Sequence, residues 1–444
     1  MIKSLFVFVA LGMAGTLAVG QEFIDSRPAV ARKLKSVNMT NTISGIPLKG
    51  QKRYVWRPRR KSPPPPRRRR PPPPKRRPRR PPRSKAPPPP RPNPSPPPPS
   101  PSPSPPSPPP TPPADRCTSA GWNMLFEDNF NTFDASKWSY QLYDGYQYGI
   151  GDWGNQQLEW MSNSTNNVYT ADGNLIINAR LEPDPEVLWN DCWDECRQRC
   201  TNLGYVPGSQ EFAWCIDPCG WPRCDFIRKR QITSGRIRTF QKFSVSPTEQ
   251  TNKIRIEGRM KLPTGTGLWP AFWLLPEAGA RTTCSGCGQY GIWPSSGEID
   301  VMEAVNSMDR IIGSVHYGRE GEHKYSSYFT PSLDPEGWHT FALEWTPTMM
   351  TWAMDGYEYG SSSSSAATPD GSGWFSGGAP GTNAPFGVGD TFHLILNLAV
   401  GGTLPNAVYQ ATHNGQIPDL KMVQDALRPD GKKMMVDWVR VCGQ

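Results

Sequence analysis

The chain has 444 residues, with 52 prolines, 10 cysteines and a formal net charge of +10 at pH 7. The positive charge is concentrated in residues 57–113, which hold 31 of the prolines and 16 Lys and Arg residues but no acidic residue. Residues 114–444 carry a net charge of −12, so the overall charge does not indicate a nucleic-acid-binding domain. The two compositions predict a basic linker followed by an acidic globular domain.

Residues 1–20 have the layout of a secretory signal peptide. Lys3 is followed by an apolar run from Leu5 onward and by a small-residue ending at residues 18–20. The run is too short and too rich in glycine to cross a bilayer, and no other segment approaches membrane length. We therefore predict a secreted, extracellular protein without a membrane span, and an uncleaved membrane anchor is the disfavoured alternative.

Two further segments precede the domain. Residues 21–56 show no strong periodicity, and we expect them to be disordered. Residues 57–113 should run as a polyproline II linker, because proline locks φ and lacks an N–H donor. Its length would be roughly 180 Å at about 3.1 Å per residue.

The linker has two halves. Residues 57–91 contain all of its basic side chains, which would attract polyanions such as acidic cell-wall polysaccharide. Nucleic acid is the competing partner for an arginine-rich run, but secretion argues against it. Residues 92–113 are uncharged and rich in Ser and Pro, and they resemble the hydroxyproline-rich glycoprotein segments of plant and green algal cell walls.

Residues 114–444 contain many short β-rich runs separated by turns of Gly, Pro, Asp and Ser. These runs lack helical periodicity, which predicts an all-β domain built as a β-sandwich. The expected strands cover Arg236–Phe240, Lys253–Leu262, Ala271–Leu275, Ile311–Tyr317, His339–Trp345, Thr351–Met354, Phe392–Ala399 and Met434–Val441.

One further expected strand, with sequence EIDVME, carries three carboxylates among apolar residues. Strand side chains alternate between faces, so Glu298 and Asp300 share one side. Strict alternation would bury Glu303 in the core, which is costly for an unpaired charge. One extra residue, a β-bulge near Val301 and Met302, would restore the phase and bring all three acids onto one face. The alternative is an acidic strand face exposed to water.

Three acids on one face suit the cleavage of a glycosidic bond. One carboxylate must be ionised to attack the anomeric carbon, while another holds a proton for the departing oxygen. Retaining enzymes separate the two groups by about 5 to 5.5 Å, whereas a flat strand would hold Glu298 and Glu303 roughly 13 Å apart. The bulge must therefore bend the strand, and Asp300 between the two would couple their titrations.

The residues Glu298–Glu303 match the E-x-D-x-x-E signature of glycoside hydrolase family 16, in the bulge-containing branch that includes laminarinases, the endo-β-1,3-glucanases. The resemblance implies a concanavalin-like jelly roll with a concave substrate-holding sheet, and catalysis without a cofactor by a monomer. It also implies Glu298 as the nucleophile, Glu303 as the acid and base, and Asp300 as their helper. Six further blocks resemble the family in the family's order: Trp122–Trp138, Gly151–Trp160, Ala171–Arg180, Leu268–Pro276, Trp338–Gly356 and Leu394–Gly402.

The resemblance also implies residues that contact the sugar. Tryptophans of the concave sheet would stack against sugar faces, although tryptophans in strands are more often packing residues. A polar segment would line the cleft, and a histidine would lie near the carboxylates. The expected substrate-binding residues are Trp269, Trp273, Trp293, Asn155, Glu159 and His316.

A structural calcium on the convex side recurs among relatives of this family. Its ligands here would be the oxygen atoms of Glu127, Gly173 and Asp437, a set suited to that ion. The sequence departs from the family at Ala411–Lys433, where relatives are shorter, and Ser361–Pro385 is expected to form a flexible loop.

Ten cysteines in a secreted chain predict disulfides. Cys117 and Cys442 bracket the domain, and a bond between them would stabilise it by roughly 4 to 5 kcal/mol. Cys284 and Cys287 form a CxxC pair in the loop before the acidic strand. Zinc binding is the alternative for this pair, but no second CxxC or ordered His pair completes a site.

The remaining six cysteines lie in residues 184–225, a segment that interrupts the family pattern. We interpret it as a small disulfide-stapled insertion, because so short a piece cannot bury a core of its own. Its tryptophans either pack internally or extend a sugar-binding surface: Trp189, Trp193, Trp214 and Trp221.

The sequence thus predicts a secreted, retaining endo-β-1,3-glucanase that acts on β-glucan. Three alternatives remain open. The same site would also suit mixed-linkage β-1,3-1,4-glucan or glycosyl transfer in cell-wall remodelling. The domain would otherwise be a non-catalytic β-glucan-binding protein, or the chain chiefly a structural wall glycoprotein.

Overall fold

The computed structural model describes residues 116–277, 286–307, 310–319, 321–332, 334, 337–364, 373–374 and 383–444. The predicted signal peptide, the segment 21–56, the linker 57–113 and Cys284 lie outside these residues, as does most of Ser361–Pro385.

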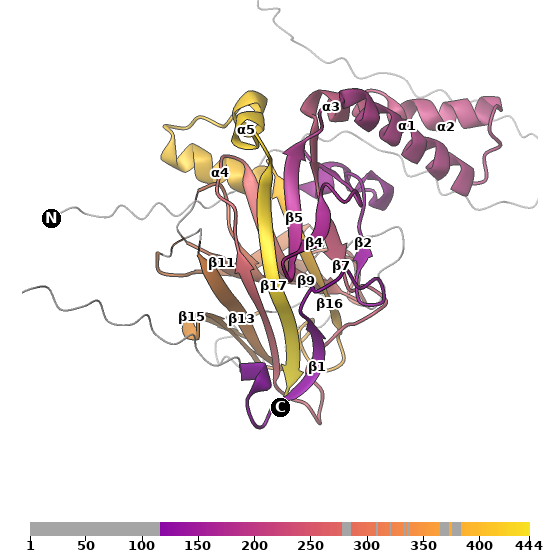
Figure 1. The fold of residues 1–444 in the computed structure, drawn as a ribbon. Helices are drawn as coiled ribbons and strands as arrows, with labels where there is room; N and C mark the ends of the chain where they lie inside the picture. Colours follow the sequence, from indigo (N-terminus) through magenta and orange to yellow (C-terminus); the bar gives the residue numbers. More distant parts are fainter. Residues whose placement is uncertain are drawn as a thin grey trace, which may run out of the picture. The chain divides into compact units, whose positions relative to one another are not determined.

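Two sheets, antiparallel except for the pairing of β3 with β6, pack against each other as a jelly-roll β-sandwich, which confirms the predicted fold class (Figure 1). We call the ten-stranded sheet the first sheet and the seven-stranded sheet the second sheet. The strands of the second sheet lie in the spatial order β12 (Glu322–Phe329), β11 (Ile312–Arg319), β10 (Glu298–Glu303), β9 (Leu268–Pro276), β16 (Phe392–Val400), β7 (Arg236–Arg238) and β2 (Ser139–Tyr140). The first is ten-stranded, in the order β15 (Tyr357–Ser363), β14 (Met349–Met354), β13 (Trp338–Thr346), β8 (Ile254–Lys261), β17 (Lys432–Gly443), β5 (Asn174–Leu181), β6 (Ile232–Ser234) and β3 (Trp160–Met161), with β1 (Asn123–Asp128) beside β17 and β4 (Val168–Ala171) beside β5.

Each of the predicted β-rich runs is a strand of these two sheets. Strand β16 illustrates why: its sequence FHLILNLAV is apolar except for His393 and Asn397, and all nine of its residues are buried. Large aromatic side chains fill the space between the sheets, where they remove much apolar surface from water. The largest fully buried ones include Trp138, Trp345, Trp352, Phe272 and Phe341.

A disulfide joins the two ends of the domain, as predicted. Cys117 and Cys442 are 325 residues apart in sequence, and their Cα atoms lie 5.4 Å apart. Cys287 is also disulfide-bonded, which excludes the zinc alternative for this residue.

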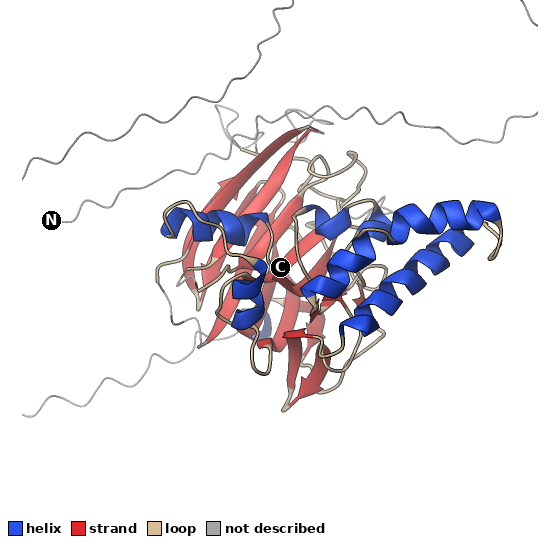
Figure 2. Ribbon diagram, turned by 90° about the horizontal axis from the view of Figure 1, so that it is seen from above, coloured by secondary structure: helices blue, strands red, loops and turns tan. Residues whose placement is uncertain are grey.

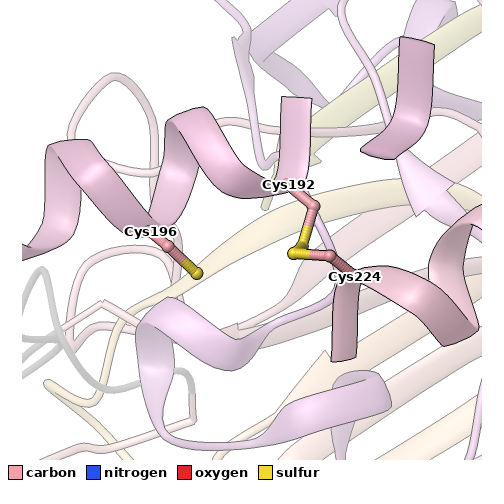
Figure 3. A group of neighbouring side chains, drawn as sticks. All are labelled: Cys192, Cys196 and Cys224. Carbon is pink, nitrogen blue, oxygen red and sulfur yellow. A yellow bond between two sulfur atoms is a disulfide. The ribbon is translucent and has the colours of Figure 1, made fainter. Parts of the chain in front are cut away.

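The cysteine-rich insertion is helical, which the sequence analysis did not predict. It contains α1 (Pro185–Asn202), α2 (Gln210–Gly220) and α3 (Arg223–Arg230), and the first two extend beyond the sheets in Figure 2. Helix α1 starts where the side chain of Asp184 accepts from Glu186 N, with proline at the first helical position. Three disulfides staple the helices, and Figure 3 shows the first of them: Cys192–Cys224, Cys196–Cys219 and Cys200–Cys215.

The four tryptophans of the insertion divide into two pairs. Trp189 and Trp193 pack against a small cluster that includes Leu188, whereas Trp214 and Trp221 are 66% and 57% exposed. Internal packing, one of the two predicted roles, therefore applies to the first pair.

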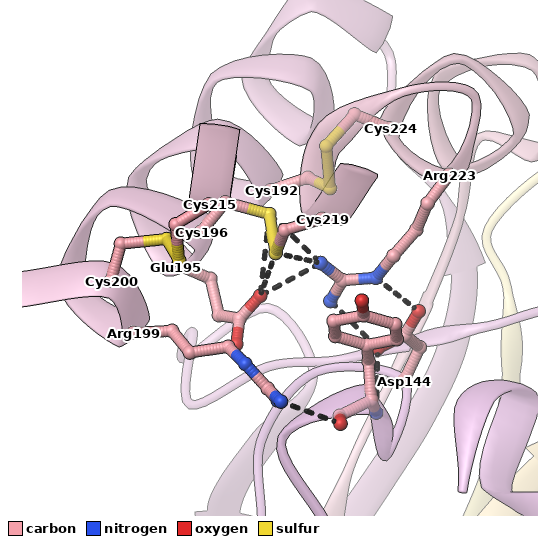
Figure 4. Close-up of a disulfide and its surroundings, with 11 residues drawn as sticks. Asp144, Cys192, Glu195, Cys196, Arg199, Cys200, Cys215, Cys219, Arg223 and Cys224 are labelled. Atoms are coloured by element: carbon pink, nitrogen blue, oxygen red, sulfur yellow. Dashed lines mark hydrogen bonds and ion pairs between the residues drawn. A yellow bond between two sulfur atoms is a disulfide. The ribbon is translucent and has the colours of Figure 1, made fainter. Parts of the chain in front are cut away.

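Arginines attach the insertion to the segment that carries the short helices η2 (Tyr146–Tyr148) and η3 (Gly151–Gly154). Arg199 donates to Tyr146 O at 3.0 Å, and Arg230 donates to Asp152 Oδ1 at 2.6 Å. Figure 4 shows a third arginine, Arg223, between Asp144 of this segment and Glu195 of α1.

The long segment between β16 and β17 contains two helices, α4 (Thr403–Thr412) and α5 (Leu420–Ala426). The expected extra residues at Ala411–Lys433 include the end of α4 and all of α5. Among the described residues, no helix has both the length and the apolar character needed to cross a membrane.

Candidate active site

The predicted β-bulge is present in β10, in the middle of the second sheet. On one side Asp300 is opposite Ser314 and Glu303 is opposite Ile312. Two residues of β10, Val301 and Met302, therefore face only Gly313 between those partners. Both are completely buried in the core, so the extra residue keeps Glu303 on the face of the other acids.

Residues of the neighbouring strands β11 and β14 fit this bulge. Trp352 of β14 donates its indole N–H to the backbone oxygen of Asp300 at 2.8 Å, which satisfies a carbonyl next to the irregular pairing. A Cβ atom on Gly313 would lie 2.3 Å from the Trp352 ring. Glycine at this position therefore leaves the space that the indole occupies.

Each carboxyl side chain of β10 has a defined polar neighbour. Trp293 Nε1 donates to Glu298 Oε2 at 3.1 Å, and Trp269 Nε1 donates to Glu303 Oε1 at 2.8 Å. His316 of β11 places Nε2 at 3.1 Å from Asp300 Oδ2 and 3.9 Å from Glu298 Oε1. One histidine nitrogen thus lies within reach of two acids.

The environment favours protonated carboxyl groups at neutral pH. Burial, reinforced by the charge of Asp300, raises the pKa of Glu298 to about 8 and that of Glu303 to about 8. Burial also raises the pKa of Asp300 well above its usual value. Because the three groups repel one another when ionised, they titrate as a unit. Such a cluster can hold one carboxylate and one carboxylic acid at the same pH.

Two predicted sugar-stacking tryptophans have other contacts. Trp269 is only 9% exposed and packs against Val305 and Ala399, so little of its ring is left for a sugar. Trp273 is half-buried and donates to Asn397 Oδ1 at 2.6 Å. Trp293 is 38% exposed beside the acids, and of the three it alone presents a substantial open surface.

The two predicted residues of the polar segment also differ. Asn155 has an exposed side chain, and its backbone oxygen accepts from Thr403 N at 2.8 Å. Glu159 is 2% exposed and accepts from Val400 N at 2.8 Å. Burial raises the pKa of Glu159 to about 7. The structure therefore places Glu159 in a contact with β16 and not on a sugar-binding surface.

The sequence analysis missed two polar residues of this sheet. Arg236 of β7 is buried between the rings of Trp153 and Trp273, at 4.3 and 4.7 Å, and donates to Gln141 Oε1 at 2.7 Å. His323 of β12 lies 2.8 Å from His316 through its Nε2 atom. Strand alternation from His316 across the β11–β12 hairpin would have indicated the second residue.

The residues expected to hold calcium do not fit that ion. Glu127 Oε1 accepts from Arg440 Nε at 2.8 Å, because β1 pairs with β17 and places these residues opposite each other. Asp437 forms an ion pair with Arg259. Both carboxylates are thus paired with arginines, and Gly173 stands in a turn with φ of 72°. Among the described residues, the non-cysteine group close enough to share a metal is Glu298, Asp300 and His316.

Comparisons with known proteins identify a family and several relatives. Residues 231–373 match Glycosyl hydrolases family 16, whose glucanases act without a cofactor. Glucan endo-1,3-beta-glucosidase A1 of Niallia circulans is 32% identical over 334 residues, which cover 72% of this chain and 38% of the relative. Glucan endo-1,3-beta-glucosidase of Cryptopygus antarcticus is 28% identical over 291 residues, or 63% of this chain and 81% of the relative.

A third relative is named as a binding protein. Beta-1,3-glucan-binding protein of Penaeus monodon is 27% identical over 372 residues, which cover 72% of this chain and 89% of the relative. The chain thus spans little more than a third of the first relative and most of the other two. Sequence likeness over the sandwich and the acid-bearing strand leads to one assignment: the chain belongs to glycoside hydrolase family 16.

Proposed function

We propose that the protein is a secreted endo-β-glucanase that hydrolyses β-1,3-glucan with retention of anomeric configuration. The observation that supports this most is the bulged strand β10, which turns Glu298, Asp300 and Glu303 to one face of the second sheet. Two of the relatives are named as endo-1,3-beta-glucosidases, which favours β-1,3-glucan as the substrate.

In this proposal Glu298 attacks the anomeric carbon. Its carboxylate is stabilised by the N–H of Trp293 and, within 3.9 Å, by the charged form of His316. Glu298 is also the most exposed of the three acids, with 18% of its side chain accessible against 3% for Asp300. It is therefore the acid best placed to meet a sugar carbon.

Glu303 gives its proton to the departing oxygen and then activates water to release the glycosyl group from Glu298. Burial and the neighbouring Asp300 raise the pKa of Glu303 to about 8, as they do that of Glu298. Because the acids repel one another when ionised, ionisation of Glu298 favours the proton on Glu303. Asp300 couples the two groups, because each lies on the same face one side chain away.

The second candidate function is glucan binding without catalysis. It is favoured by the likeness to a protein named as a beta-1,3-glucan-binding protein. Retention of both Glu298 and Glu303, together with their shared buried environment, supports the enzyme instead.

The proposal also covers the surroundings of the domain. We place the protein outside the cell, from the layout of residues 1–20, as a monomer held by residues 57–91 near acidic wall polysaccharide.

The full chain should be incubated with laminarin, with the mixed-linkage glucan lichenan and with a β-1,3-oligosaccharide acceptor, while proton NMR follows the anomeric signals. We expect laminarin to be cut fastest and the β-anomer to appear first. An α-anomer first would contradict retention, and products longer than the substrate would indicate transfer. Binding of laminarin without cleavage would favour the second candidate.

A further inference from the structure

A second histidine stands behind the one that contacts the acids. In the antiparallel hairpin of β11 and β12, His316 is opposite Tyr325 and His323 is opposite Gly318. The two histidines are therefore diagonal neighbours on one face, where long side chains meet. Gly318 offers no side chain there, and His323 Nε2 lies 2.8 Å from His316 Nδ1.

A contact of this length between two ring nitrogens requires one proton between them. One ring must donate, and the other must accept. Burial and the charge of His316 lower the pKa of His323 to about 4, so His323 is neutral at neutral pH. Its charged neighbours on β12, Glu322 and Lys324, pair with each other at 3.4 Å.

The rings around His323 support the neutral, accepting form. Trp293 and Tyr325 lie 4.6 and 5.6 Å away between ring centroids, and His316 stacks on it at 5.0 Å. No acidic side chain of the described residues is within ion-pair distance of His323, whereas His316 has two. A proton shared by the pair is thus held on the His316 side.

The other nitrogen of His316 faces an unsatisfied acid. Asp300 Oδ2 is buried and lacks a hydrogen bond of good geometry among the described residues. His316 Nε2 lies 3.1 Å from it. If Nδ1 is engaged by His323, Nε2 is the ring atom left to give a proton to Asp300 or take one from it.

We propose that His323 is a positioning residue: by accepting the Nδ1–H of His316, it fixes His316 Nε2 as the atom that exchanges a proton with Asp300. The exchange converts imidazolium and carboxylate into imidazole and carboxylic acid, so the pair's total charge is unchanged. The inference rests on the proposed function, in which negative charge moves from Glu298 to Glu303 past Asp300 when the glycosyl bond forms.

Nitrogen NMR of the full chain tests the inference without reference to activity. The chain has five histidines, so substitutions can assign the signals. In the unaltered protein we expect the neutral ring of His316 to carry its proton on Nδ1, hydrogen-bonded to His323 Nε2. His323→Phe should abolish this preference, and His323→Gln, whose amide oxygen can still accept, should preserve it. His413→Phe, the same change at an exposed histidine, is the control.

Kinetics on laminarin then separate positioning from sugar binding. We expect His323→Phe to lower kcat about ten- to hundredfold and to shift its pH profile, with KM unchanged, while His323→Gln retains most of kcat. Equal tautomers in all variants, or a rise in KM with unaltered kcat and pH profile, would overturn the inference. Absence of hydrolysis by the unaltered protein would instead count against the proposed function, and the NMR result would still decide the tautomer.

Discussion

Two regions of the molecule bury charged groups, and they do so in opposite ways. In the insertion, Arg223 donates to both oxygens of Asp144 at 2.8 Å and to Glu195 at 2.7 Å (Figure 4). Burial opposes its charge, yet the bonds to both acids outweigh this and raise the pKa of Arg223. In β10, one histidine lies within reach of only two of the three acids, and burial together with the charge of Asp300 raises the pKa values of Glu298 and Glu303.

The difference separates a structural site from a reactive one. A buried charge with complete partners stays in one protonation state, so it can hold the insertion to the segment that carries η2 and η3 but cannot exchange protons. Buried acids without complete partners cost stability and change protonation state near neutral pH. Substitutions in the two regions should therefore have opposite effects on activity and on stability.

The largest expected effect is on turnover. Glu298→Gln and Glu303→Gln should each lower kcat on laminarin by about 10³-fold or more, because each removes a group that reacts directly. Circular dichroism should show an unchanged fold. Glu358→Gln, at an exposed position of β15, is the control. Near-normal turnover by either active-site variant would refute the roles assigned to the acids.

The second effect is on stability. Arg223→Met should lower the free energy of unfolding by about 3 to 5 kcal/mol, because Asp144 and Glu195 are left buried without a partner. Urea denaturation measures this. Arg228→Met removes a more exposed arginine, with 34% of its side chain accessible, and should cost about 0 to 1 kcal/mol. Equal losses in the two variants would mean that the pairing of Arg223 is not what holds the insertion.

The third effect is a gain in the free energy of unfolding instead of a loss. The folded pKa of Glu298 is about 8, against about 4.3 in the unfolded chain. Between these values the folded state binds more protons than the unfolded state, so the free energy of unfolding falls as pH rises. Glu298→Gln should therefore be more stable than the unaltered protein at pH 8, by about 1 to 3 kcal/mol, and similar to it at pH 4. Urea midpoints at both pH values decide this, and a less stable variant at pH 8 would contradict it.

The smallest effect concerns one hydrogen bond. Trp269→Phe removes the N–H that favours the ionised form of Glu303. The pKa of Glu303 should rise, and the alkaline limb of kcat/KM should move to higher pH by less than about one unit. Trp338→Phe on the opposite sheet is the control. If the alkaline limb does not move, or moves to lower pH, the Trp269 hydrogen bond does not lower the pKa of Glu303.

The sequence was most informative where local pattern and charge agree. The β-bulge could be predicted because three acids in EIDVME cannot share a face under strict alternation, and placing Glu303 unpaired among the apolar core side chains would be too costly. The disulfide between Cys117 and Cys442 followed from their positions at the ends of the family pattern. In both cases the identity and spacing of a few residues were enough to predict the local structure.

The insertion and the substrate residues were harder to predict. Six cysteines allow 15 pairings, although Cys192, Cys196 and Cys200 at four-residue steps would have indicated one face of a helix. The bond between Arg223 and Asp144 joins residues 79 positions apart, which no local pattern encodes. The burial of Glu159 depends on β16, a strand far away in the chain, so it could not be predicted from the sequence around Glu159.

The central claim is that Glu298 forms the bond to sugar, and a mechanism-based label tests it most directly. A 2-deoxy-2-fluoro β-1,3-glucosyl fluoride should glycosylate the nucleophile with loss of the anomeric fluoride and stall there, since the fluorine at C2 slows release of the glycosyl group. Mass spectrometry of the digested protein should find the label on Glu298. A label on Glu303 or Asp300, or rapid turnover of laminarin with no covalent adduct and an α-anomer product, would contradict the account.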